Sequence, residues 1–297
     1  MEKPQFIVDA PLSEVNVTRW HAGTTTQATD KVAEEVPIAL IYNGVSHAVM
    51  LATPQDLEDF ALGFSLSEGI LQNKSELYDV EIVVQAQGIE LRLDVATQSF
   101  VKLKERRRNL VGRTGCGLCG TESLEQALRL PEKTLKLGKN TSSNIHAASG
   151  ASVETIKASS IQAAFHEMPK LQTLQQATGA THACAWVNTE LNEDGEIQLL
   201  REDVGRHNAM DKLIGALAKQ QSQPKLPPIN AGFVLTSSRA SVEMVQKVAV
   251  AGYTMLAAIS APTGLAVRIA EAYGVTLVGF LRNQQFVIYT HADRIQT

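Results

Sequence analysis

Short apolar runs separated by turn-forming residues begin at Val36, after a largely polar opening stretch that extends through Glu35. The run VPIALIYNGVSHAVML is divided by Asn43 and Gly44, which both tolerate positive φ, and this pattern predicts a β-hairpin. DVEIVVQAQGIELRLDV predicts two further strands that meet around Gly88.

A helix is expected between these two pairs of strands. Thr53 is predicted to be its N-cap, with Pro54 in its first turn, and the helix should run to about Ser67. One helical face carries four apolar residues, Leu57, Phe60, Ala61 and Phe64. The N-terminal unit is therefore predicted to be ββαββ.

The second half of the chain alternates predicted strands and helices from Thr181 onward. HACAWVN and EIQLLRE should pair around Asp194-Gly195, and the helix that follows carries Ala209, Met210, Leu213 and Leu217. GFVLT, YTMLAAIS, VTLVGF and FVIYT are predicted strands, and SVEMVQKVAVAG and GLAVRIAEAYG are predicted helices. Crossovers of this length favour an α/β layer with parallel strands.

Composition narrows the class of protein. The 297 residues are 44% hydrophobic and 20% charged with a formal net charge of −4, which is typical of a globular protein and argues against a general nucleic-acid binder. Three cysteines do not make a secreted disulfide framework, and the opening residues lack a signal-peptide layout. The most apolar stretch, VAVAGYTMLAAISAP, is too short to cross a bilayer. We therefore expect a cytoplasmic protein without a membrane span.

Two of the cysteines lie three residues apart in GRTGCGLCG. A CxxC pair serves as two zinc ligands, a redox couple or a nucleophilic thiol with a helper. A zinc site needs two further ligands, for which the best remaining pair is His182 and Cys184. A redox couple normally opens a helix, which the four glycines around Cys116 disfavour.

The same segment also fits a mobile, activated thiol. A basic run precedes the cysteines and comprises Lys102, Lys104, Arg106, Arg107, Arg108 and Arg113. Positive charge favours the thiolate and attracts an anionic partner, which suits a carrier that collects a group at one site and delivers it at another. The alternative is that the basic residues form a solvated helical face.

Two polar clusters follow predicted strands, where α/β proteins commonly bind ligands. The first contains Glu202, Asp203, Gly205, Arg206, His207 and Asn208, in which Arg206 and His207 are candidates to hold phosphate or pterin groups. The alternative for this cluster is helix capping by Asp203 beside a surface histidine. The second contains Thr236, Ser237, Ser238 and Arg239, and it is either an anion site or a helix cap.

Long motifs along nearly the whole chain resemble the formate dehydrogenase accessory protein family, FdhD/NarQ. They include AEEVPIALIYNGVSHAVMLATPQDLEDFALGFSLSEGI, LKERRRNLVGRTGCGLCG, EDVGRHNAMDKLIGALA, SSRASVEMVQK and TLVGFLRNQQFVIYTHADR. The resemblance implies a sulfur carrier that accepts sulfur from a cysteine desulfurase as a persulfide. The carrier passes it to the molybdenum cofactor, bis-molybdopterin guanine dinucleotide, before insertion into formate dehydrogenase.

The resemblance also assigns residues. It makes Cys116 the persulfide cysteine and Cys119 the second, assisting cysteine. The family's cofactor-binding segment, with its guanine nucleotide contacts, falls on Phe280, Leu281, Arg282, Asn283, Gln284 and Gln285, although relatives carry Gly and Arg where this chain has Gln284 and Gln285. Ser238, Arg239 and His207 are added as candidate cofactor contacts. Cys184 matches no motif and is treated as a core cysteine.

For the fold, the resemblance implies an N-terminal α+β unit over residues 1–115 that ends in the basic arm. Residues 116–297 would then hold the CxxC loop and a domain like that of cytidine deaminases. Deaminase chemistry is not expected, because the H-x-E and P-C-x-x-C signatures are both missing. A homodimer without a permanent metal is implied, and the alternative is a zinc-stabilised cofactor chaperone with structural cysteines.

Overall fold

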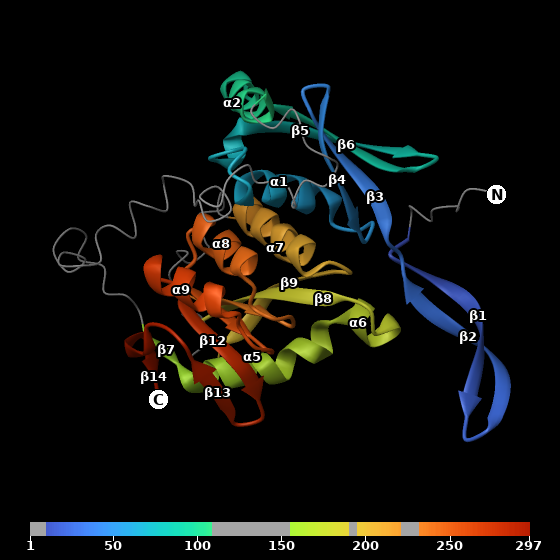
Figure 1. Ribbon diagram of the computed structural model, residues 1–297, viewed down its shortest axis with the longest axis vertical. Coiled ribbons are helices and arrows are strands. Elements are labelled where there is room, and N and C mark those ends of the chain that lie inside the picture. The colour runs from blue at the N-terminus through green and yellow to red at the C-terminus, as the bar shows by residue number, and fades with distance from the viewer. Residues whose placement is uncertain (1–9, 109–154, 190–194, 221–231) are drawn as a thin grey trace.

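The computed structural model describes residues 10–108, 155–189, 195–220 and 232–297. Two sheets, each covered by helices, form the body, and a two-stranded ribbon projects from it (Figure 1). The chain is therefore mixed α/β, as predicted. The predicted boundary near residue 115 lies outside the described residues and stays a prediction.

The N-terminal sheet has the order β4-β3-β6-β5. Its strands are β3 (Val36–Tyr42), β4 (Val45–Ala52), β5 (Leu77–Gln85) and β6 (Gly88–Val95), and α1 (Leu57–Ser67) packs on one face. β3 alternates between fully buried and half-buried positions because every second side chain points toward α1. The predicted ββαββ unit is confirmed, and β3 and β6 run parallel at its centre.

The predicted N-cap is wrong. α1 begins at Leu57 behind Asp56, which has a φ of 52°, and Thr53 instead faces the C-terminal unit. The Thr53 N–H donates to Oδ2 of Asp203 over 3.0 Å, and its hydroxyl accepts the N–H of Val204 over 3.1 Å. Thr53 is fully buried, so this tertiary contact replaces the local cap.

The opening residues form a hairpin that the polar sequence did not predict. β1 (Leu12–His21) and β2 (Thr24–Ala33) pair antiparallel along their whole length, and the ribbon leaves the body at the right of Figure 1. The basic run before the cysteines begins in α2 (Thr97–Arg108). Lys102 and Lys104 are exposed there, and the Lys104 ammonium lies 4.4 Å from the centre of the Phe100 ring. These two lysines therefore lie on a solvated helical face.

The C-terminal sheet has the order β13-β12-β11-β10-β8-β9. β10 (Gly232–Thr236), β11 (Met255–Ala258) and β12 (Thr276–Arg282) run parallel, as the crossover lengths predict. β8 (His182–Asn188), β9 (Glu196–Asp203) and β13 (Gln285–Ile288) are antiparallel additions. The sheet therefore combines a parallel centre with antiparallel edges.

Helices cover both faces of this sheet. α7 (Arg206–Gln220), α8 (Val242–Val250) and α9 (Gly264–Ala272) pack on one face. α5 (Ala158–Leu171) packs on the other, beside the short pair β7 (Ile156–Lys157) and β14 (Ile295–Gln296). α6 (Thr173–Thr178) follows α5, and two 3₁₀ turns, η1 (Lys74–Glu76) and η2 (Ala292–Arg294), complete the described elements. Neither α5 nor α6 was predicted from the sequence.

The two units pack through α1 and α7, which lie against each other in Figure 1. Gly63 and Gly215 occupy the crossing point, and a Cβ atom on either would overlap a carbonyl oxygen of the other helix. Ion pairs surround this contact: Arg201 with Asp59 at 2.7 Å, and Lys247 with Asp211 at 2.8 Å. The N-terminal unit is thus fixed against the helix that leads out of β9.

Candidate site at the carboxyl edge of the parallel strands

One edge of the C-terminal sheet collects most of the described candidate residues. β10, β11 and β12 all end there, and because β8 runs antiparallel to β10, β8 begins there. Asp203 pairs with His182 across β9 and β8, and Ala183 donates its N–H to Oγ of Ser237 over 2.9 Å. Backbone hydrogen bonds extend this line of residues toward β12: the N–H of Ser260 donates to the carbonyl of Ser238, and the N–H of Phe280 donates to the carbonyl of Ser260.

A cationic and imidazole cluster lies at the β9 end of this row. α7 begins at Arg206 and places His207 in its first turn, and His182 opens the neighbouring strand β8. Burial lowers the pKa of both histidines below their usual value, and the positive charge of Arg206 lowers the pKa of both further. Oε2 of Glu243 lies 3.3 Å from Nε2 of His207, and its negative charge raises the pKa of His207, which partly offsets this lowering. At neutral pH both imidazoles are therefore neutral and Arg206 carries the positive charge.

A buried ion pair holds the start of α7 in place. Asp203 and Lys212 are both fully buried, and Nζ of Lys212 lies 2.7 Å from Oδ2 of Asp203. The other carboxylate oxygen of Asp203 accepts the N–H of Gly205 over 2.8 Å and the side-chain amide of Asn208 over 3.0 Å. Asp203 therefore anchors the turn before α7, and among the hydrogen bonds of the described residues it accepts none from a backbone N–H of the helix itself. His207 is half-buried rather than a surface histidine.

Ser238 is buried and Arg239 is exposed just after β10. The Ser238 hydroxyl lies 3.0 Å from Oγ1 of Thr236 and donates to the carbonyl of Arg239 over 3.0 Å. The N-cap of α8 is Ser241, three residues after Ser238, so Ser238 is not its cap. The hydroxyl of Ser238 is thus engaged within the protein, and the guanidinium of Arg239 is the exposed charged group of this segment.

The predicted cofactor segment, residues 280–285, forms the end of β12, a two-residue turn and the start of β13. Phe280 is exposed with a φ of 54°, at an irregularity in the pairing of β12 with β13. Leu281 is buried, whereas Arg282, Asn283, Gln284 and Gln285 are exposed. The Arg282 guanidinium donates to the carbonyl of Ile259 over 2.7 Å, so the segment stays attached to the end of β11.

The cysteines divide into two groups. Cys116 and Cys119 lie outside the described residues, so the structure does not place them relative to the edge. Cys184 is fully buried in the core, as predicted, and its thiol lies 3.5 Å from Oγ1 of Thr236. Burial raises the pKa of this thiol to about 12. Cys184 is therefore an unreactive core residue at neutral pH.

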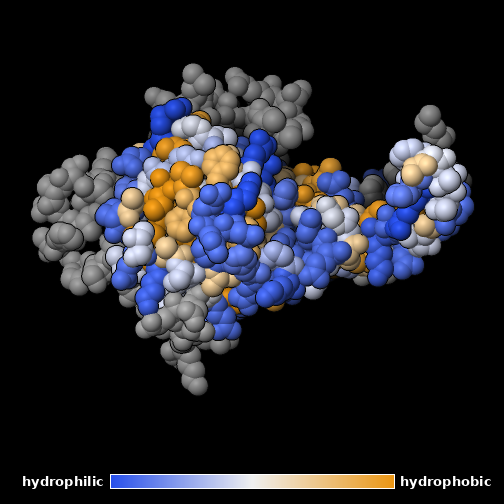
Figure 2. Space-filling view, turned by 90° about the horizontal axis from the view of Figure 1, so that it is seen from below, coloured by the Kyte–Doolittle hydropathy of each residue, from blue (hydrophilic) through white to orange (hydrophobic). Residues whose placement is uncertain are grey.

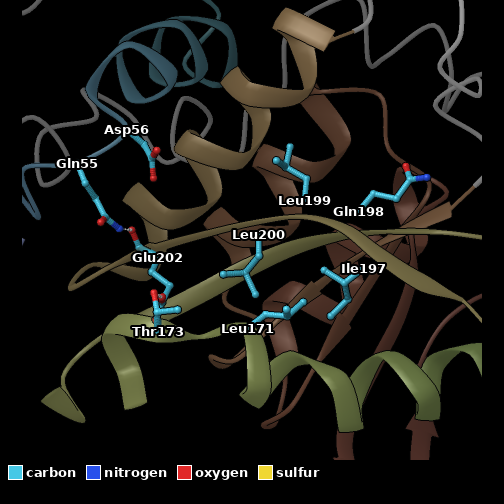
Figure 3. Close-up of a pocket in the computed structure, with 9 residues that line it drawn as sticks. All are labelled: Gln55, Asp56, Leu171, Thr173, Ile197, Gln198, Leu199, Leu200 and Glu202. Carbon is cyan, nitrogen blue, oxygen red and sulfur yellow. Dashed lines mark hydrogen bonds between the residues drawn. The ribbon is translucent and has the colours of Figure 1, made fainter. Parts of the chain in front are cut away.

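A pocket among the described residues lies elsewhere, along the outer side of β9, and has a volume of about 390 Å³. In Figure 3, Leu171, Ile197 and Leu200 gather on the side of α5, and the side chain of Gln55 reaches toward Glu202. The carboxylate of Glu202 is already occupied, because it accepts the N–H groups of Leu174 and Gln175 at the start of α6 over 2.9 Å each. Of the residues in the two predicted polar clusters, only Glu202 lines this pocket.

No metal-binding group of three or more His, Cys, Asp or Glu side chains occurs among the described residues. Within the same ranges, no helix is long and apolar enough to cross a membrane.

His182 was missed as an edge residue, because only the strand register shows its position. The sequence identifies the neighbouring Arg206 and His207 from the change of strand to helix. His182, however, lies beside them because β8 enters the sheet from the edge at which β10 leaves it. A helix–strand pattern alone cannot show this antiparallel insertion.

Comparisons with known proteins agree with the motifs. Residues 33–296 match the model of the FdhD/NarQ family. The chain is 54% identical over 280 residues to a protein of Cupriavidus necator named sulfur carrier protein FdhD, covering 94% of this chain and 88% of that protein. It is 47% identical over 274 residues to a protein of the same name from Bordetella petrii, covering 92% and 89%.

A solved structure supports the fold. The crystal structure of a protein from Desulfotalea psychrophila, described as a candidate formate dehydrogenase accessory protein, superposes with a TM-score of 0.68. The two chains are 22% identical, and the match covers 96% of this chain and 99% of the other. Because the family model spans nearly the whole chain and the curated relatives match along their length, this chain belongs to the FdhD/NarQ family.

Proposed function

We propose that this chain is a sulfur carrier that takes part in the maturation of formate dehydrogenase. The observation that carries the proposal is its 54% identity to a relative named as a sulfur carrier, over 94% of the chain. A cysteine desulfurase would donate the sulfur, and the molybdenum cofactor, as bis-molybdopterin guanine dinucleotide, would receive it as a substrate. A cytidine-deaminase-like arrangement of the C-terminal unit and a homodimer belong to the same proposal.

The first chemical step would be thiol exchange at Cys116. Its thiolate attacks the outer sulfur of the desulfurase persulfide, a new S–S bond forms, and the bond to the desulfurase cysteine breaks. The desulfurase leaves as a thiolate, and Cys116 holds the sulfur as R–S–SH. No external oxidant or reductant is needed, because the sulfane sulfur keeps its oxidation state.

Release would use Cys119. Its thiolate attacks the inner sulfur of the Cys116 persulfide, a Cys116–Cys119 disulfide forms, and HS⁻ leaves for the cofactor. The two electrons that convert sulfane sulfur to hydrosulfide come from the two cysteine sulfurs. A cellular thiol would then reduce the disulfide before the next cycle.

The carboxyl edge has the chemistry that a guanine nucleotide requires. Arg206, Arg239 and Arg282 provide guanidinium groups, which suit phosphate recognition. The neutral imidazoles of His182 and His207 can each donate one hydrogen bond to an anionic or carbonyl oxygen. Phe280 offers an exposed ring at the β12 end of the same edge. We therefore assign nucleotide binding to this edge and the rest of the 280–285 segment.

Persulfide loading is tested by mass spectrometry of the intact protein after incubation with a cysteine desulfurase and cysteine. A gain of one sulfur on Cys116 is expected, lost in Cys116→Ser and kept in Cys119→Ala. Stoichiometric zinc that disappears in Cys116→Ser, with no sulfur gain, would instead favour the zinc-stabilised chaperone.

Nucleotide binding is tested separately by titration calorimetry with GDP. Arg206→Gln should weaken binding by about 10- to 100-fold, because a charged hydrogen-bond partner of a phosphate is lost. Arg268→Gln, at an exposed arginine of α9, is the matched control. Unchanged GDP affinity in Arg206→Gln would remove this residue from the site.

A further inference from the structure

The link between β4 and α1 contacts the turn that leads into α7. Thr53, in this link, is fully buried and binds residues 203–212 through three of its groups. Its N–H donates to Oδ2 of Asp203 over 3.0 Å, and its hydroxyl accepts the N–H of Val204 over 3.1 Å. Its carbonyl accepts a hydrogen bond from Nζ of Lys212 over 3.0 Å. One residue of the N-terminal unit therefore binds both the turn and the helix of the C-terminal unit.

A second tie between the units lies beside Thr53. The side-chain amide of Asn208 donates to the carbonyl of Leu51 over 2.8 Å and to Oδ1 of Asp203 over 3.0 Å. The β1–β2 ribbon, which projects from the body in Figure 2, contributes none of these hydrogen bonds. The start of α7 is therefore tied to the N-terminal unit through the end of β4 and the residue that follows it.

Asp203 gives the turn a single arrangement. Its side chain is fully buried, and one of its carboxylate oxygens contacts Thr53 and Lys212. The other oxygen contacts Gly205 and Asn208. Such a carboxylate cannot rotate without breaking charged hydrogen bonds, which are about twice as strong as neutral ones. The packing is also tight, since a Cβ atom on Gly205 would lie 2.8 Å from the amide nitrogen of Asn208. The turn is thus fixed from both units.

Arg206 depends on this turn for its direction. It is the first residue of α7, directly after the turn, and His207 follows it. Among the described residues, Nε of Arg206 is buried and has no hydrogen-bond partner. Because no bond fixes the guanidinium at that atom, the backbone at the start of α7 sets where the side chain points. A shift of that backbone would carry both Arg206 and His207 away from the edge.

We propose that Thr53 is a positioning residue for the carboxyl edge. It holds the turn before α7 so that Arg206 and His207 are directed at the bound nucleotide. The N-terminal unit thereby completes a site whose contact residues all lie in the C-terminal unit. The inference rests on the proposed nucleotide binding at this edge. By linkage, a nucleotide that requires this arrangement also strengthens the contact between Thr53 and the turn.

Thr53→Val is the test variant, because it keeps the shape of the side chain and removes the hydroxyl that accepts the N–H of Val204. In calorimetric titration of the full chain with GDP, it should weaken binding about 5- to 10-fold, which corresponds to one lost hydrogen bond. Thr53→Ser restores the hydroxyl, and its GDP affinity should return to within about twofold of the wild-type value.

Thr290→Val is the matched control. Thr290 is 4% exposed, and its hydroxyl accepts the N–H of Leu277 over 2.8 Å and donates to the carbonyl of Val275 over 2.7 Å. The control therefore removes the same kind of buried hydroxyl, but at the start of β12, the opposite end of that strand from the edge. We expect a comparable shift of the urea unfolding midpoint in the two valine variants, and wild-type GDP affinity in Thr290→Val.

The pKa of His182 provides a measurement that needs no nucleotide. His182 lies on β8; burial lowers its pKa, and the positive charge of Arg206 lowers it further. If Thr53→Val lets Arg206 turn away, the pKa of His182 in an NMR titration should rise above its wild-type value. The pKa should not change in Thr53→Ser or Thr290→Val, because neither variant moves Arg206.

The outcomes decide the proposal. A GDP affinity of Thr53→Val equal to that of the wild type, or a loss matched by Thr290→Val, would overturn it. If the wild type binds no GDP, nucleotide binding at the edge fails and the His182 titration decides the positioning role alone. A rise of that pKa confined to Thr53→Val then supports the role, and an unchanged pKa overturns it. Should Thr53→Val fail to fold, Asn208→Ala takes its place in both measurements, because it removes the tie to Leu51.

Discussion

Gly63 of α1 and Gly215 of α7 face each other where the two helices cross. A Cβ atom on Gly63 would lie 1.7 Å from the carbonyl oxygen of Asp211, and one on Gly215 would lie 1.9 Å from that of Asp59. Both obstacles are helix backbone, which cannot turn aside as a side chain can. The close approach of the N- and C-terminal units therefore depends on the absence of a side chain at both positions.

Gly63→Ala and Gly215→Ala should each destabilise the protein by about 1–3 kcal/mol, because the helices must separate. In an ordinary helix the same change stabilises by up to about 1 kcal/mol. Gly264→Ala, at the start of α9, is the control, since its Cβ would meet only the Arg268 side chain at 3.7 Å. Urea unfolding measures the stability of all three variants. An unchanged unfolding midpoint for Gly63→Ala would contradict the close packing of α1 against α7 at this position.

The buried pair of Asp203 and Lys212 gives a second prediction. Lys212→Met leaves the carboxylate buried without its cation and should cost about 3–5 kcal/mol. Adding Asp203→Asn should recover part of that loss, because the uncompensated charge is gone. Arg92→Gln removes an exposed ion pair with Glu90 and should cost at most about 1 kcal/mol. If the losses of unfolding free energy from Lys212→Met and Asp203→Asn simply add in the double variant, the two side chains are not directly coupled.

Particular residues show how far the sequence predicts this fold. Asn43 and Gly44 predicted their hairpin because positive φ is a local requirement, and both have it, at 45° and 80°. The cap at Thr53 was wrong because Asp203, 150 residues away, binds that backbone. The ribbon of β1 and β2 was missed because it has no buried face, so its sequence lacks a strong apolar alternation.

The residues of the candidate site were likewise only partly predictable from the sequence. Arg206, His207, Ser238 and Arg239 were found because each follows a strand, and strand ends are visible in the sequence. The approach of His182 to Arg206 depends on how β8 inserts between β9 and β10. That order is set by tertiary packing, so no local pattern predicts it.

The two edge histidines should titrate below the usual value of about 6.5. Their folded-state pKa values are lowered, so the unfolded chain binds more protons as the pH falls through this range. These histidines therefore contribute stability at neutral pH that is lost below about pH 6.5. Arg206→Gln should raise the pKa of His182 and of His207 in NMR titrations, and Arg206→Lys, which keeps the charge, should not. A pKa at or above the usual value in the wild type would contradict the assigned burial and charge.

Cys184 should resist thiol reagents in the folded protein. Burial raises its pKa to about 12, so at pH 8 almost none of it is thiolate, and no solvent reaches the sulfur. In the Cys116→Ser, Cys119→Ser variant, a disulfide reagent at pH 8 should release no product from the native protein and one equivalent after unfolding in guanidinium. Prompt reaction in the native state would mean that the core opens around β8 and β10. The same variant then reports, through its slow labelling rate, how often that opening occurs.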